Sequence, residues 1–81
     1  MANYRVRAVG ADFEASDDDG SDYISPQVAG QAAVRAAIAI AADEIERGKK
    51  SSIIEAHVRD GHRTISRFVI ALSVEALPPL D

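Results

Sequence analysis

The chain has 81 residues and a mass of 8.6 kDa, which is room for one domain with one small hydrophobic core. Nine Lys and Arg against 13 Asp and Glu leave a net charge of −4, which argues against bulk attraction to nucleic acid or an anionic membrane. There is no cysteine, which excludes disulfides and thiolate metal sites, and no apolar run long enough to span a bilayer. We therefore expect a single cytoplasmic domain over residues 1–81 with no membrane partner.

Two short strands are predicted before the first helix. Residues 3–9 alternate polar and apolar side chains, which is the period of a half-buried strand. Gly10 begins a turn, and residues 12–15 are expected to return as a second strand. The polar, acidic residues 16–22 follow, and we expect them to form a solvated loop.

A long helix is predicted over residues 26–47. Ser25 is a favourable N-cap, Pro26 suits the first helical position, and Gly48 is expected to end the helix. A helical projection places the following residues on one wide face: Gly30, Ala33, Val34, Ala37, Ile38, Ile40, Ala41 and Ile45. Because most of these side chains are small, we expect the helix axis to lie close to a sheet.

A second hairpin is predicted from residues 51–59 and 63–75, joined by a turn at Gly61 and ended by Pro78-Pro79. Even-numbered residues of both strands are expected to face the helix. The predicted core consists of Ile38, Ile45, Ile54, Phe68, Ile70 and Leu72. The order ββαββ indicates an α+β fold, in which one long helix packs on one face of a four-stranded antiparallel sheet.

The sheet face that the helix leaves uncovered is the strongest candidate for an interaction. It carries more β-branched residues than a solvent-facing surface usually does, together with several arginines. The candidate interface residues are Arg5, Arg7, Ile53, His57, Ile65, Arg67 and Val69. We expect this face to be buried against a second copy, which makes the protein a non-enzymatic, homodimeric interaction module. A protein partner is the other use of such a face, whereas nucleic acid would need aromatic platforms that none of the four aromatic residues clearly supplies.

No motif in the chain indicates catalysis, a cofactor or a metal ion. Six carboxylates fall within eleven residues before the helix, but a calcium loop with Gly20 as its sixth residue would begin at Ala15 and end at Pro26, which are not ligands. A solvated loop or a partner-facing acidic patch is expected there, with a looser divalent-ion site as the alternative. His57 and His62 are expected on opposite faces. Nucleophile elbows and phosphate-binding glycine loops are missing from the sequence.

Several features occur together in a known order: a short strand with Tyr4, the acidic segment Asp17–Gly20, an alanine-dense helix over residues 29–42, and a turn at Asp60-Gly61 before an apolar strand. This order resembles the small uncharacterised bacterial ββαββ proteins classed as a domain of unknown function, and the resemblance implies the fold without an activity. The opening also resembles the antitoxin of HicA/HicB pairs, although the proline-glycine-cysteine-type segment before that helix is missing. This second resemblance implies the alternative function, a regulatory protein that binds a protein or nucleic-acid partner.

Overall fold

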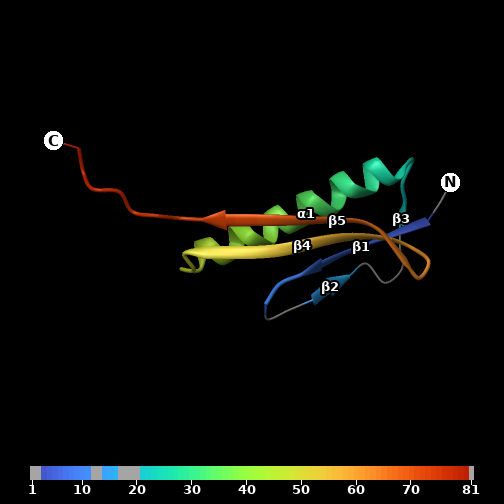
Figure 1. The fold of residues 1–81 in the computed structure, drawn as a ribbon, viewed down its shortest axis with the longest axis horizontal. Coiled ribbons are helices and arrows are strands. Elements are labelled where there is room, and N and C mark those ends of the chain that lie inside the picture. Colours follow the sequence, from blue (N-terminus) through green and yellow to red (C-terminus); the bar gives the residue numbers. More distant parts are fainter. Residues whose placement is uncertain (1–2, 12–13, 17–20, 81) are drawn as a thin grey trace.

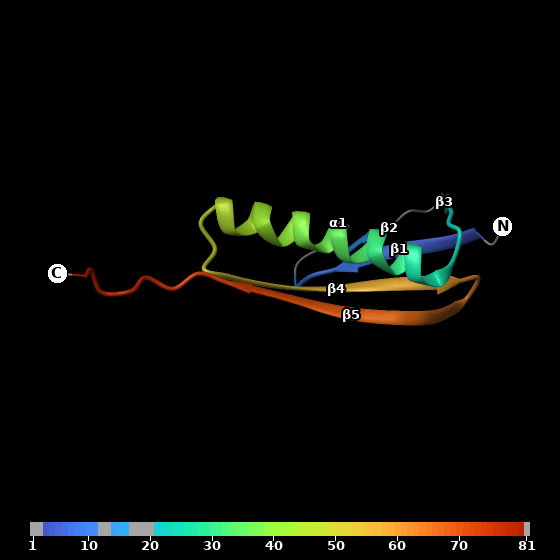
Figure 2. The same ribbon diagram turned by 90° about the horizontal axis from the view of Figure 1, so that it is seen from above.

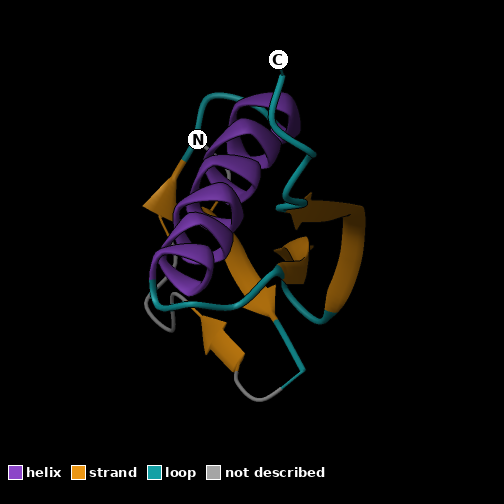
Figure 3. Cartoon of the chain, turned by 90° about the vertical axis from the view of Figure 1, so that its left-hand side faces the viewer, coloured by secondary structure: helices purple, strands orange, loops and turns teal. Residues whose placement is uncertain are grey.

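The computed structural model describes residues 3–11, 14–16 and 21–80 (Figure 1). The elements in chain order are β1 (Asn3–Val9), β2 (Glu14–Ser16), β3 (Ser21–Asp22), α1 (Pro26–Glu46), β4 (Ser51–Asp60) and β5 (Arg63–Ser73). The strands form an antiparallel sheet in the order β2-β1-β4-β5, with the short β3 paired to β1. The helix lies along one face of this sheet (Figures 2 and 3). The predicted α+β fold and its ββαββ order are confirmed.

The element boundaries differ little from the predicted ones. The helix ends one residue early and β5 two residues early, while β4 is one residue longer. The second strand was predicted to begin at residue 12, which lies outside the described residues, and its described part continues to Ser16. The prediction of a loop over residues 16–22 is wrong at both ends, because Ser16 pairs with β1 and Ser21–Asp22 add the short strand β3.

The capping signals predicted from the sequence are present at both ends of α1. The side chain of Ser25 accepts a hydrogen bond from the backbone N–H of Val28 at 3.2 Å, and Pro26 occupies the first helical position. At the other end, Gly48 has a φ of 108°, a conformation that glycine adopts without strain. The Gly48 N–H donates to the carbonyl of Ile45 at 3.0 Å and so satisfies one of the last carbonyls of α1.

A stripe of alanine joins the helix to the sheet. Every fourth residue from Ala29 to Ala41 is fully or almost fully buried, and this spacing keeps the stripe on one side of α1. The buried core consists of Tyr4, Ala8, Ala29, Ala33, Ala37, Ala41, Ile54, Ala56 and Val58. The strand residues in this set all come from β1 and β4, so the buried core is centred on these two strands, while α1 also packs against β5.

The predicted core is only partly correct. Ile54 is 1% exposed, and Ile45 and Ile70 are half-buried. The prediction is wrong for the remaining three residues, which are substantially exposed: Ile38 at 51%, Phe68 at 40% and Leu72 at 37%. The physical reason is that the alanine stripe, rather than Ile38, faces the sheet, and that α1 covers the edge strand β5 only in part. The predicted strand faces are correct, since Ile70 pairs with Ile54 on the helix side.

Candidate interaction site

The structure places six of the seven predicted interface residues on the sheet face opposite α1: Arg5, Arg7, Ile53, His57, Arg67 and Val69. Three of them form one row across the sheet, because Arg7 of β1 pairs with His57 of β4, which pairs with Arg67 of β5. Ile65 differs from the rest, since it is the extra residue of a β-bulge where the pairing of β5 with β4 shifts.

Ion pairs occupy the centre of this open face. Glu55 Oε1 lies 3.0 Å from His57 Nε2 and 2.9 Å from a terminal nitrogen of Arg67, while Arg7 pairs with Glu14 at 2.7 Å. The hydrogen bond with His57, and then that with Arg67, lowers the pKa of Glu55, so its carboxylate stays charged. Burying these charges against a partner would remove their hydration at a cost. The centre of the open face is therefore a poor site for an apolar contact.

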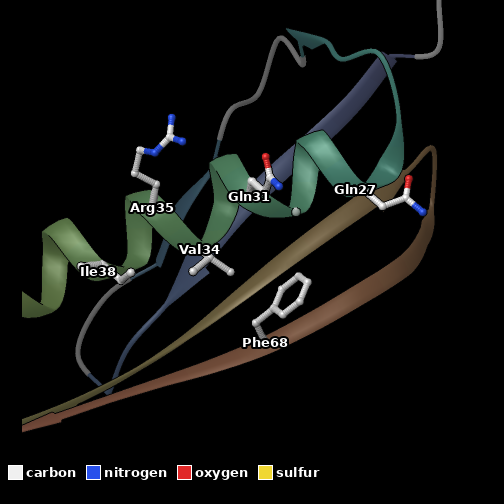
Figure 4. Close-up of a pocket in the computed structure, with 7 residues that line it drawn as sticks. Gln27, Gln31, Val34, Arg35, Ile38 and Phe68 are labelled. Carbon is white, nitrogen blue, oxygen red and sulfur yellow. The ribbon is translucent and has the colours of Figure 1, made fainter.

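An apolar groove lies on the helix-covered side of the sheet, between β5 and α1 (Figure 4). Its volume is about 470 Å³, and its lining residues are Gln27, Gly30, Gln31, Val34, Arg35, Ile38 and Phe68. Gly30 allows the Phe68 ring to lie against the helix, because a Cβ at this position would be 3.2 Å from the ring's Cζ atom. Val34 and Ile38 stand beside the alanine stripe and supply the large apolar side chains on the helical side of the groove. The sequence showed these apolar residues but not that they line a groove.

β5 is the edge strand of the sheet. It pairs with β4 on one side, and no strand in the described part of the chain pairs with its other side. The strand is 11 residues long and has exposed apolar side chains on both faces, with Phe68 and Leu72 toward the helix layer and Val69 on the open face. A long apolar edge with free backbone groups is a typical surface for strand addition.

The chain continues beyond β5 as an extended segment, residues 74–80. In two perpendicular views it runs away from the sheet in roughly the direction of β5 (Figures 1 and 2). Its first residue still follows the sheet, since the Val74 N–H donates to the Lys50 carbonyl at 2.8 Å. Further along, Leu77 is 80% exposed. This segment therefore adds apolar side chains next to an edge that is already apolar.

A hydroxyl and a carboxylate meet where α1 returns to the sheet. The buried Ser52 hydroxyl donates a hydrogen bond to Glu44, which also pairs with Lys49 at 3.1 Å. The bond from Ser52, and then that from Lys49, lowers the pKa of Glu44, which makes this carboxylate a weak base. The arrangement ties the end of α1 to β4 and does not resemble an activated nucleophile.

A divalent-ion site is the alternative prediction for the carboxylates that precede the helix. Within residues 3–11, 14–16 and 21–80, no three His, Asp or Glu side chains are grouped so that they could hold a metal ion. Residues 17–20, which include three of the aspartates, lie outside the described residues, so the sequence prediction for them is unchanged.

The fold and its free edge define a small ββαββ domain. The chain belongs to the family described as a domain of unknown function, DUF6894, whose model matches residues 6–71. This confirms the resemblance to an uncharacterised domain, whereas no comparison shows the likeness to HicB-type antitoxins. No curated protein and no solved structure matches the chain significantly. None of the helices in the described residues is both long and apolar enough to cross a membrane. A cytoplasmic location stays a prediction.

Proposed function

We propose that the protein is a non-enzymatic interaction module that forms a homodimer through the β5 side of its sheet. The observation that carries the proposal is the edge strand β5, which exposes apolar side chains on both faces beside an apolar groove. Removing such surface from water is the main driving force for association. A second copy would also enlarge the small core that a domain of this size can build alone.

This interface overlaps the one expected from the sequence. Arg67, Val69 and the bulge residue Ile65 all belong to β5 and are shared by both. Arg5 and Arg7 lie two strands away on β1, where the open face is charged. In the proposed dimer the two copies therefore meet along the edge of the sheet, and the ion pairs at the centre of the open face stay exposed to water.

Nucleic acid is a weaker candidate for the partner. Arg5 and Arg59 are register partners and line a polar cavity of about 580 Å³ near the β4–β5 turn, which could attract a phosphate. Single-stranded nucleic acid also needs aromatic side chains on which its bases stack. The described aromatic residues are placed elsewhere: Tyr4 in the core, Tyr23 packed against it, and Phe68 in the groove.

Sedimentation equilibrium of the full chain at tens of micromolar tests the proposal. We expect the wild type to have twice the 8.6 kDa chain mass and the Leu72→Glu variant to have one chain mass. Two like charges brought into a desolvated interface cost several kcal/mol, so the variant should separate the copies. Ala39→Glu, on the exposed side of α1, is the matched control and should remain a dimer.

Two results would contradict this proposal. The first is a monomeric wild type. The second is a Leu72→Glu protein that stays dimeric. If the dimer were also lost in Arg5→Glu, this second result would instead support association through the open face. Far-UV circular dichroism of each variant shows whether the fold has survived.

A further inference from the structure

We infer that the two copies pair β5 with β5 antiparallel about a two-fold axis at Ala71, and that residues 74–77 of each copy continue this pairing along the other's groove. The inference rests on the proposed homodimer and specifies its register. Each residue then lies opposite the residue that is equally far on the other side of Ala71. The free edge of β5 is used from residue 65 onward, and the two sheets become one.

The apolar side chains match in this register. On the helix side, Phe68 lies opposite Val74 of the second copy, and Ile70 lies opposite Leu72. Val74 already follows the register of the sheet through its hydrogen bond to Lys50, so it is placed to take part. Beside Phe68, it would enter the groove whose helical side is apolar. Apolar cross-strand pairs of this kind are the main stabilising contacts within sheets.

The charges match as well. Arg67 of the open face lies opposite Glu75 of the second copy, which the alternation of β5 would place on the same face if it continued past Ser73. Within the described residues, Glu75 is exposed and forms no ion pair. If the axis moved by one residue to Ile70 or Leu72, Glu75 would instead face the apolar Ile65 or Val69. The axis at Ala71 therefore pairs the opposite charges and the apolar residues at the same time.

The two prolines mark the end of the pairing. With the axis at Ala71, Pro78 and Pro79 lie opposite Thr64 and Arg63, which are the first residues of the second copy's β5. Proline has no N–H to donate to a ladder, so pairing cannot continue past this point. The paired segment thus ends in both copies where the strand itself begins.

A single introduced cysteine tests the register, because the chain has no cysteine of its own. Directly opposite residues in an antiparallel pair have Cα atoms about 4.5–5.5 Å apart, which suits a disulfide. We expect Ala71→Cys to form a cross-linked dimer rapidly under mild oxidation. The control Val69→Cys lies opposite Ser73, so its two thiols are about 13 Å apart along the strands and should remain unlinked.

An exchange of charges gives a second, independent readout. Arg67→Glu and Glu75→Arg should each raise the dissociation constant of the dimer by about tenfold, because each places like charges opposite one another. The double variant should recover most of the lost affinity. Recovery is the informative result, since Arg67→Glu alone also removes the contact with Glu55.

The outcomes separate this inference from the proposed function. A dimeric wild type with an unlinked Ala71→Cys, or with a double variant no tighter than the single ones, would overturn the register and leave the homodimer standing. Efficient cross-linking of Val69→Cys would do the same. A monomeric wild type would overturn both.

Discussion

Replacing Ile54 by alanine is expected to cost about 2–5 kcal/mol of the free energy of unfolding. Ile54 is 1% exposed and is one of the two largest fully buried side chains, together with Val58. The buried residues of α1 are alanine and glycine, which have no side-chain length with which to fill the cavity. Because domains are stable by only about 5–15 kcal/mol, this single change should unfold a large part of the protein.

The adjacent residue provides the control for this experiment. Ile53 belongs to the same strand but is 64% exposed on the opposite face, so Ile53→Ala should change the stability by no more than about 0.5 kcal/mol. Urea unfolding of both variants and the wild type, at one fixed protein concentration, keeps the contribution of association the same in all three proteins. Equal losses for the two variants would show that the strand faces are assigned incorrectly.

Enlarging Ala37 is the second change with a large expected effect. Ala37 is completely buried in the middle of the alanine stripe, where the helix backbone comes close to the sheet. Ala37→Leu forces three additional carbon atoms into this contact, and overpacking of a filled core costs about 1–3 kcal/mol or more. Ala39→Leu adds the same side chain on the exposed side of α1 and should be nearly neutral.

Thermal unfolding distinguishes these two leucine variants. A loss of 1 kcal/mol lowers the melting temperature of a domain this small by about 4–8 °C, so Ala37→Leu should melt clearly below the wild type. If both variants melted with the wild type, the helix would not be held against the sheet by the alanine stripe.

Local signals were sufficient to predict the order of elements. Ser25, Pro26 and Gly48 act at short range, and alternation along β4 and β5 determines which side chains share a face. The short strand β3 could not be predicted, because two residues have no recognisable period and are held by their pairing with β1. Strand order likewise depends on contacts between distant segments, which one sequence does not display.

The interaction site was predicted less well than the fold. Hydrophobicity assigned Phe68 and Leu72 to the core, whereas both are partly exposed because α1 covers the edge strand β5 only in part. Alternation correctly predicted which strand residues lie on the open face, with the exception of the bulge residue Ile65. The ion pairs on this face depend on which side chains become cross-strand neighbours, and the sequence does not show this. The position of β5 at the edge decides where apolar surface remains exposed, and this position follows only from the tertiary structure.

Amide hydrogen exchange tests most directly whether β5 pairs with β5 of a second copy. It is measured by NMR on the full chain at one protein concentration at which the dimer forms and one at which it dissociates. In the single chain, no backbone carbonyl among the described residues accepts a hydrogen bond from the N–H groups of residues 75–77. Pairing with a second β5 would protect those that point toward it, along with the free edge of β5 itself. We predict slower exchange at the higher concentration in residues 66–77. Rapid, concentration-independent exchange of this segment in a sample that sediments as a dimer would contradict the account.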